Sequence, residues 1–325
     1  MNRKRVVTIV AYAIILVLAA TLTGCSVHSQ AIAEHANDQG ISSQEIGWIE
    51  QAAPKKTTAV PKRPRKLLVF NLAIGYRHSS IPYAARALEV MGQKTGAFEV
   101  IQSEDMSVFL PENINKFDAV CLNSSSQLDF SDPNLRRGLM GFVKAGGGLV
   151  GIHGATKNFR NWPEVAEMLG GIFDGHPWHA QGRWTVKIED PDHSLMAAFK
   201  NRFADVVDVG DPNRAIVASF KATTFRINDE IYRIKPVNLR KNCRVLMGLD
   251  MTDVVNSGAE GVRPTDEDIP ISWVRTFGKG RVFYCSFGHN HHVFRNSAIL
   301  QHLLDGIRFA LADLPADTMV LPKCR

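Results

Sequence analysis

The feature that most constrains the fold is a regular alternation of short apolar runs with amphipathic segments, which begins at Lys66. The apolar runs favour β-strands, and the segments between them have the spacing of helices with one buried face. The predicted strands of this half are 66–72, 98–101, 118–122 and 149–152, with helices after Ser80 and Asp132. Strands that alternate with helices predict an α/β fold with a mostly parallel central sheet and helices on both faces.

The second half of the chain changes character. Four further runs predict strands, at 184–188, 244–249, 271–276 and 281–287, and Phe277-Gly278-Lys279-Gly280 predicts a hairpin between the last two. An amphipathic helix over 299–311 closes the pattern. With no internal repeat and no second linker, we expect one domain over residues 66–312 and a C-terminal tail over 313–325.

The first residues carry a targeting signal. Three basic residues at positions 3–5 precede an apolar run over 6–20 that is short for a membrane span, and the run ends in Leu22-Thr23-Gly24-Cys25. This ending resembles the lipobox of bacterial lipoproteins, so residues 1–24 are predicted to be a lipoprotein signal peptide and Cys25 the lipidated residue. The protein would then be anchored to a membrane of the bacterial cell envelope, facing the periplasm or the exterior. An uncleaved signal anchor and an ordinary secretory peptide with a chance cysteine are the alternatives.

Residues 25–65 are rich in Ala, Gln, Ser, Lys and Pro, which predicts a flexible tether with room for a short helix around Ile46 to Ile49. Without residues 1–24, 35 basic residues stand against 32 acidic ones, a net charge of +3. That balance, with no basic helix that carries interleaved aromatics, argues against a nucleic-acid partner.

Two classes of cofactor site are absent from the sequence. No GxGxxG follows the first predicted strand and no GxxxxGK[ST] occurs, which disfavours dinucleotides and triphosphates. No CxxC occurs either, which excludes a zinc ribbon or a thioredoxin motif. Cys121, Cys243 and Cys285 lie in apolar runs, where small buried thiols are common.

Histidines follow three of the predicted strands. In open α/β sheets ligands bind outside the carboxyl ends of the strands, and His78, His153 and His289 fall in loops at such ends. His153 stands in Gly151-Ile152-His153-Gly154-Ala155, where a nucleophile elbow would carry Ser or Cys. Histidine there predicts a general base, a general acid or a metal ligand rather than a covalent nucleophile. A histidine that caps the next helix or hydrogen-bonds in the core is the structural alternative.

Two more clusters hold groups of the same chemistry. The loop 170–179 contains His176 and His179, of which we expect His179 to lie at the surface. Asp229 and Glu230 precede an apolar and aromatic segment, and a carboxylate pair of this kind is a solvated turn unless the fold brings it to His153.

Taken in order, these motifs resemble those of the ThuA-like (trehalose utilisation) family. The residues that carry the resemblance are 75–80, 145–156, 175–177, 189–193, 229–232 and 280–289, and they cover roughly 66–311. The family is similar in fold to class I glutamine amidotransferases, which implies a flavodoxin-like three-layer sandwich. Glutaminase chemistry is disfavoured on residue grounds, because His153 replaces the elbow cysteine and no His-X-Glu follows it.

The resemblance implies carbohydrate catabolism on a trehalose-like disaccharide, a glycoside or a 3-keto derivative made by a partner sugar dehydrogenase, by hydrolysis, elimination or isomerisation. It implies a pocket with His153, His176, Glu230 and His289 as catalytic groups, in which the three histidines could hold a zinc-like divalent metal. The predicted substrate-binding residues are Tyr76, Arg77, His78, Trp178 and Tyr232.

Two segments depart from the family pattern. Residues 200–225 and the polar loop 253–268 are predicted insertions that could reshape specificity. A second hypothesis therefore stays open, in which the chain is a non-catalytic lipoprotein that binds sugars, with Trp162, Trp178 and Trp184 as stacking surfaces.

Overall fold

The computed structural model describes residues 40–200, 206–207, 215–216, 224–236 and 239–321. The chain divides into two units after Ser43, and the unit that starts at Gln44 contains the sheet and the candidate site. The predicted signal peptide, the predicted lipidation site Cys25 and most of the predicted insertion 200–225 lie outside the described residues.

A nine-stranded sheet runs through the centre of the second unit, in the order β2-β1-β3-β4-β13-β12-β11-β6-β9. Its first five strands pair in parallel. The other neighbours pair antiparallel, so β12 and β6 alone run against the remaining seven. The strands are β1 (Lys66–Phe70), β2 (Glu99–Ser103), β3 (Ala119–Asn123), β4 (Gly148–Ile152), β6 (Trp184–Ile188), β9 (Thr224–Ile227), β11 (Arg244–Leu249), β12 (Pro270–Phe277) and β13 (Gly280–Cys285). Two-stranded sheets pair β5 (Gly171–Phe173) with β10 (Ile234–Pro236) and β7 (Val206–Val207) with β8 (Ala215–Ile216).

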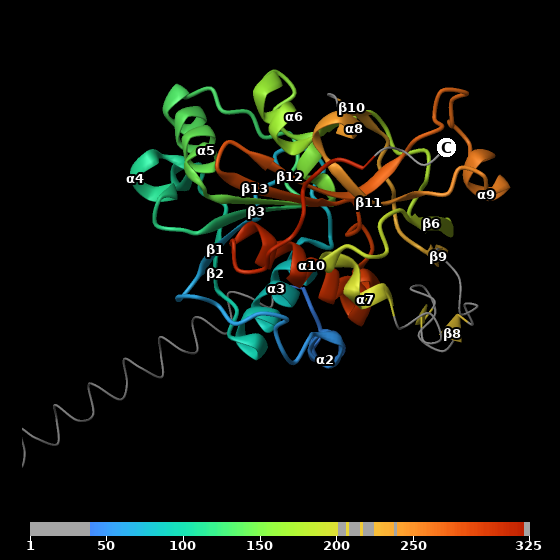
Figure 1. The fold of residues 1–325 in the computed structure, drawn as a ribbon, viewed down its shortest axis with the longest axis horizontal. Helices are drawn as coiled ribbons and strands as arrows, with labels where there is room; N and C mark the ends of the chain where they lie inside the picture. The colour runs from blue at the N-terminus through green and yellow to red at the C-terminus, as the bar shows by residue number, and fades with distance from the viewer. Residues whose placement is uncertain (1–39, 201–205, 208–214, 217–223, 237–238, 322–325) are drawn as a thin grey trace, which may run out of the picture. The chain divides into compact units, whose positions relative to one another are not determined.

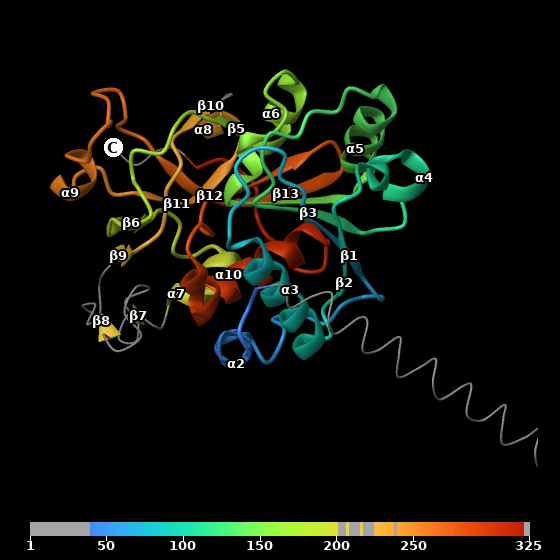
Figure 2. The same ribbon diagram turned by 180° about the vertical axis from the view of Figure 1, so that it is seen from behind.

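Helices cover both faces of the sheet, as Figures 1 and 2 show. One face carries α2 (Ser43–Ala52), α3 (Ile81–Thr95), α7 (Ala197–Lys200) and α10 (Ser297–Ala310). The opposite face carries α4 (Pro111–Ile114), α5 (Pro133–Ala145), α6 (Pro163–Leu169) and α8 (Leu239–Asn242). Four short 3₁₀ helices are η1 (Met106–Phe109), η2 (His153–Lys157), η3 (Ser194–Met196) and η4 (His291–Arg295). The expected α/β sandwich with a mostly parallel sheet is confirmed.

Local sequence signals set the helix boundaries. The α5 helix begins where the Asp132 side chain accepts a hydrogen bond from the Asn134 amide, with Pro133 in the first turn. The α3 helix ends at Gly96, whose left-handed φ of 61° suits glycine. These are the start and stop signals that the sequence offers, which is why both helices appear close to their predicted positions.

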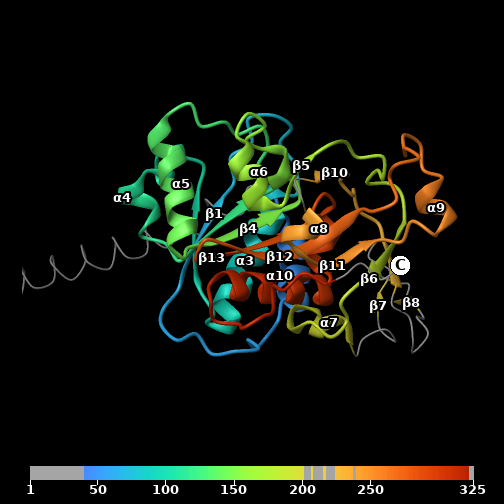
Figure 3. The ribbon, with the colours of Figure 1, turned by 45° about the horizontal axis from the view of Figure 1, so that its top comes forward.

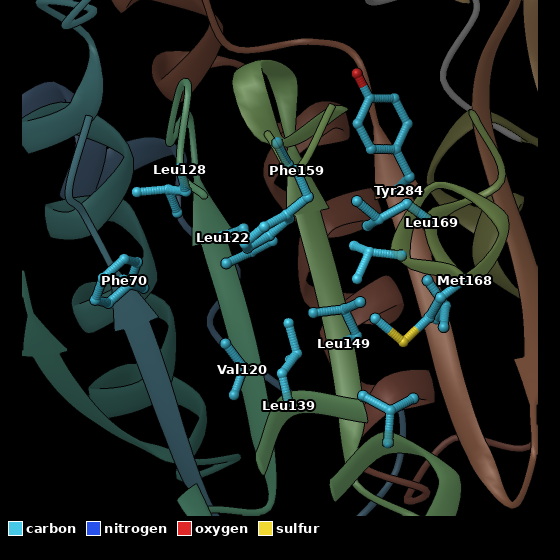
Figure 4. Packing of buried hydrophobic residues seen from close by; sticks show 14 of the residues in the cluster. Phe70, Val120, Leu122, Leu128, Leu139, Leu149, Phe159, Met168, Leu169 and Tyr284 are labelled. Atoms are coloured by element: carbon cyan, nitrogen blue, oxygen red, sulfur yellow. The ribbon is translucent and has the colours of Figure 1, made fainter. Parts of the chain in front are cut away.

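The main apolar cluster packs between the sheet and α5 and α6. Phe70, Leu122 and Leu149 project from neighbouring strands in Figure 4 and are fully buried. Met168 and Leu169 of α6 close the cluster beside Tyr284 of β13. Each fully buried side chain of this size contributes about 1.5–3 kcal/mol of transfer free energy, so the cluster fixes the strands from which the site loops emerge.

The N-terminal segment packs against the domain from Gln44 onward, where a flexible tether was expected. Ile49 of α2 is fully buried, and the Tyr83 hydroxyl donates to Glu45 at 2.8 Å. The guanidinium of Arg295 lies over the Trp48 ring, 4.3 Å from its centroid. The Thr58 hydroxyl donates to Asp305 at 2.9 Å. The described part of the predicted tether is therefore held by side-chain contacts through its length.

The polar loop 253–268 begins with α9 (Val254–Ser257) and lies at the β6 end of the sheet (Figure 3). Its Asn256 is buried and donates to the Thr185 carbonyl at 2.7 Å. Arg233 joins the far end of the loop through an ion pair with Asp266 at 2.9 Å. Among the helices that the structure describes, each is too short or too polar to cross a bilayer.

His302 of α10 makes the stability of the fold depend on pH. It is fully buried; its Nδ1 lies 2.9 Å from the Leu195 carbonyl and its Nε2 2.8 Å from the Ser272 hydroxyl. Burial lowers its pKa to about 4, whereas an unfolded histidine titrates near about 6.5. Between these values the unfolded chain binds the extra proton, so the free energy of unfolding falls as the pH falls.

We expect this histidine to remove about 2 kcal/mol of stability between pH 7 and pH 5. His302→Gln is expected to be less stable than wild type at pH 7. Between pH 7 and pH 5 its free energy of unfolding should fall by about 2 kcal/mol less than that of wild type. Urea titrations of both proteins at the two pH values measure the difference. Parallel pH dependences would contradict the neutral, buried state of His302.

Candidate functional site

The candidate site lies at the carboxyl ends of three strands of the parallel part of the sheet. His78 follows β1, His153 follows β4 directly, and His289 lies four residues after β13 ends at Cys285. The sheet order places β4 next to β13 and one strand away from β1. Parallel strands end at the same edge, so three loops that are distant in sequence meet there.

The backbone at His153 has the elbow conformation that the sequence predicted. Its φ is 45°, in the left-handed region that few residues other than glycine adopt. The next residue, Gly154, has no room for a side chain, because a Cβ there would lie 2.8 Å from the Ser124 carbonyl oxygen. The Tyr284 hydroxyl donates to the His153 carbonyl at 2.8 Å. A strained residue of this kind costs about 1–3 kcal/mol and persists only where its surroundings hold it in place.

The orientation of the His153 ring determines its protonation pattern. The side chain is fully buried, and Nδ1 lies 2.8 Å from the Ser286 carbonyl. A carbonyl oxygen only accepts, so Nδ1 carries a proton. The other ring nitrogen, Nε2, faces His78 Nε2 at 3.2 Å and Glu230 Oε2 at 3.5 Å.

Glu230 is the carboxylate that the histidines share. It is buried in the loop between β9 and β10. Its Oε2 lies 3.3 Å from His289 Nδ1, and its Oε1 lies 3.1 Å from His176 Nδ1. Burial by itself would raise the pKa of Glu230, but the hydrogen bonds and charges of His153 and His289 outweigh it and hold this pKa far below its usual range. Glu230 is therefore an anion at neutral pH.

The neighbouring Asp229 holds the His289 loop in place. It is fully buried, and its two carboxylate oxygens accept from the backbone amides of Gly288 at 2.7 Å and Asn290 at 2.8 Å. Burial raises the pKa of Asp229, against the charges of the histidines and these hydrogen bonds. Asp229 contacts both sides of His289, a positioning role that the sequence alone did not separate from that of Glu230.

The surroundings push the two outer imidazoles in opposite directions. Burial and the neighbouring charges of His153 and His289 lower the pKa of His78 to about 3, so this ring is neutral. Burial also acts to lower the pKa of His289, but the Glu230 carboxylate outweighs it and the pKa is raised. Groups whose pKa values are pushed apart in this way are typical of functional sites.

His176 and His179 lie on the outer side of Glu230. The His176 side chain is 43% exposed, and the His179 ring centroid is 5.5 Å from that of His176. Both line an open cavity of about 490 Å³. Its other lining residues are Phe173, Gly175, Pro177, Arg233, Glu260 and Gly261. The loop 253–268 thus forms one wall of this cavity through Glu260 and Gly261.

Of the predicted substrate-binding residues, Tyr232, Tyr76 and His78 contact the histidine cluster, whereas the side chains of Arg77 and Trp178 have partners elsewhere. The centroid of the Tyr232 ring lies 4.3 Å from that of His153. The Tyr76 ring stacks on His289 at a centroid distance of 6.3 Å, and Tyr76 is 58% exposed. Arg77 instead forms an ion pair with Glu104 at 2.6 Å. Trp178 is fully buried and donates to the Asn256 carbonyl at 2.9 Å. His78 lies inside the cluster and contacts His153 directly.

Within the described residues, two groups of side chains have the composition and spacing of metal ligands. The inner group is His78, His153, Glu230 and His289, and the outer group is His176, His179 and Glu230. The sequence named His153, His176 and His289 as metal ligands; the structure places His176 in the outer group and His78 in the inner one. His179, expected at the surface, is exposed and belongs to the outer group.

Comparison with known proteins relates the fold to solved structures. The family model described as ThuA, trehalose utilisation, matches residues 66–310. No curated protein matches the chain. A ThuA-like protein from Bacteroides uniformis shares 19% sequence identity at a TM-score of 0.59, with 77% of this chain and 93% of that chain covered. A ThuA-like protein from Parabacteroides merdae shares 17% identity at a TM-score of 0.53, over 80% and 94% of the two chains.

The two amide contacts of Asp229 predict a large effect of a small substitution. In Asp229→Asn an NH₂ group replaces one acceptor and faces a backbone amide, so we expect a loss of about 2 kcal/mol in the free energy of unfolding. Asp129→Asn is the matched control, because Asp129 forms only an exposed ion pair with Arg136 at 3.2 Å and should cost less than about 1 kcal/mol. Urea titration at pH 7 measures both, and equal losses would contradict the positioning role.

Proposed function

Since this chain belongs to the ThuA family of trehalose-utilisation proteins, we propose that it is an enzyme that cleaves a 3-keto-disaccharide or related keto-glycoside by elimination. The observation that carries the proposal is the pair formed by Glu230 and His176 at the open cavity, backed by the buried histidines on the other oxygen of Glu230. The family supplies the carbohydrate class, and the side-chain geometry supplies the type of reaction.

The Glu230–His176 pair has the arrangement of an oriented base. Oε1 of the anionic Glu230 faces His176 Nδ1 at 3.1 Å, which places the proton on Nδ1 and leaves the lone pair on Nε2. His153 and His289 hold the other oxygen, so the carboxylate cannot turn away. Imidazole is a base that works near neutral pH, and here it belongs to a half-exposed residue that lines a cavity.

A 3-keto sugar offers this base an acidic hydrogen. The ketone at C3 activates the hydrogen on C2, and His176 Nε2 takes that proton while its electron pair moves toward the ketone oxygen as an enolate. The enolate then re-forms the ketone, a double bond forms between C1 and C2, and the glycosidic C1–O bond breaks. The departing oxygen takes the proton back from His176. Atoms and charge balance without a further reactant.

Positive charge beside the ketone oxygen is the second requirement of this reaction. Within the buried cluster, His289 is the group that can supply it, because the Glu230 carboxylate raises its pKa. The exposed ring of Tyr76 beside His289 offers an apolar face for a sugar ring. A dehydrogenase that oxidises the C3 hydroxyl of a disaccharide is the class of reaction that must supply the substrate.

His176→Ala is expected to lower kcat for a 3-keto-glycoside by about 10²–10⁴-fold, because it removes the base and leaves the buried cluster in place. His291→Gln is the matched control, since His291 stacks on Tyr83 and belongs to neither ligand group. The measurement is NMR of the reaction in D₂O. Wild type should release the free sugar with an unsaturated keto-sugar, and should wash deuterium into C2 of recovered substrate.

Other products would point to other reactions. Release of two saturated sugars with no deuterium at C2 means direct hydrolysis, and a shifted carbonyl with an intact glycosidic bond means isomerisation. Unchanged sugar after long incubation, with heat of binding in calorimetry, favours the sugar-binding alternative, which the exposed Tyr76 would equally serve. Each of these outcomes contradicts the elimination proposed here.

We further propose that the protein is held at a membrane of the cell envelope through a lipid on Cys25, which the sequence Leu22-Thr23-Gly24-Cys25 supports. Cys25→Ala should move the protein out of the membrane fraction and abolish incorporation of a labelled fatty acid. Cys324→Ala, at the other end of the chain, is the control and should change neither. A Cys25→Ala protein that stays in the membrane fraction would contradict lipidation as the anchor.

A further inference from the structure

We propose that His78, His153, His289 and Glu230 form a binding site for one zinc-like divalent metal ion. Each residue offers one ligand atom, and the four atoms lie within 4.8 Å of one another. The role of the ion in the reaction rests on the proposed function, whereas binding of the ion does not. It replaces His176, which the sequence suggested, with His78.

The measured separations fit a tetrahedral set of ligands. Metal bonds of about 2.0–2.2 Å to nitrogen and oxygen place tetrahedral ligand atoms about 3.3–3.6 Å apart. In the cluster His153 Nε2 lies 3.2 Å from His78 Nε2 and 3.5 Å from Glu230 Oε2. His289 Nδ1 lies 3.3 Å from the same oxygen. Three of the six edges of the tetrahedron are thus present at close to their required lengths.

The three rings meet edge to face, an orientation compatible with nitrogens that converge on one ion. Their centroids are 4.7, 5.2 and 5.5 Å apart, and the interplanar angles are 84°, 87° and 81°. The rings therefore present edges to one another and none of the three pairs stacks. Nε2 of His78 and Nε2 of His153 face each other, so at most one proton lies between them, while the Nδ1 proton of His153 points to the Ser286 carbonyl.

The outer contacts of the cluster also suit a metal. The Nδ1–H of His153 donates to the Ser286 carbonyl, and a hydrogen bond of this kind fixes the tautomer of a metal-bound imidazole. His289 Nδ1 is buried and faces Glu230 Oε2 at 3.3 Å. That position beside a carboxylate oxygen suits a nitrogen that shares one metal ion with the oxygen.

His176 lies outside the proposed ligand set for a geometric reason. It contacts Oε1 of Glu230, whereas His153 and His289 contact Oε2. Its half-exposed side chain is free to exchange protons with a substrate, and the inner ion would supply the positive charge that stabilises the ketone oxygen. Base and ligand set therefore use different oxygens of one carboxylate, which makes their loss separable by mutation.

The test uses the full chain, purified in detergent, stripped with a chelator and titrated with Zn²⁺ against a chromophoric competitor. We expect wild type to bind one ion at the inner group. His78→Asn and Glu230→Gln should each weaken its binding more than about 100-fold, because mutation of residues that only orient metal ligands already lowers metal affinity about 10–100-fold. His176→Ala should keep that ion. Loading with Co²⁺ should give the visible spectrum of a tetrahedral ion in wild type and His176→Ala, and circular dichroism checks that each variant is folded.

The outcomes separate this inference from the proposed function. An ion retained in His78→Asn and Glu230→Gln but lost in His176→Ala overturns the ligand set. Turnover of a keto-glycoside by protein shown to hold no metal contradicts the role given to the ion. Metal binding that follows the expected pattern in a protein that leaves every keto-glycoside unchanged upholds the site and contradicts the function. Absence of both Zn²⁺ and Co²⁺ binding in folded wild type overturns the metal site alone.

Discussion

The carboxylate of Glu230 is the group on which the rest of the site depends. An anion that is taken out of water must be compensated by charges or hydrogen bonds at close range, because transfer into a medium of low dielectric constant costs several kcal/mol even after relaxation. Here the compensation comes from His153 and His289 on one oxygen and His176 on the other. These residues come from separate loops, so the carboxylate links the carboxyl ends of β4 and β13 to the loop that follows β5.

Rigid support around that carboxylate comes from hydrogen bonds between side chains and the backbone. Asp229 fixes the His289 loop through two amides, and Ser286 and Tyr284 of the same chain segment hold the ring and the carbonyl of His153. The elbow at His153 could not relax without disturbing the contact between Gly154 and the Ser124 backbone. The buried part of the site is therefore organised before any ligand arrives, which lowers the cost of binding either a metal ion or a developing negative charge.

The outer part of the site follows different rules. His176 and His179 are exposed and line the open cavity, and Tyr76 is exposed beside His289. The wall formed by Glu260 and Gly261 comes from the loop 253–268, which the sequence predicts to be an insertion. Loops tolerate sequence change better than strand ends do, so one fold can keep a buried centre of fixed geometry and serve several substrates through different loops.

The sequence by itself determined the fold class and the edge of the sheet where the histidines gather. Apolar runs, the helix cap at Asp132 and the small residues around His153 are local signals, and they act over the few residues that form each element. The Ser80 side chain does not cap α3 as its position suggests, because its hydroxyl donates to the Gly288 carbonyl. The tertiary structure alone decided which side chains meet. Nothing local separates His78 from Arg77, yet one lies in the buried cluster and the other pairs with Glu104.

The same applies to Trp178, which the fold buries against Asn256, and to His176, which it places on the outer oxygen of Glu230. The segment after Gln44 is a further case, because its composition favours a tether while its Glu45 and Trp48 find partners on α3 and η4. Contacts of this kind join residues that are far apart in the chain. They depend on the register and twist of the whole sheet, which no single stretch of sequence encodes.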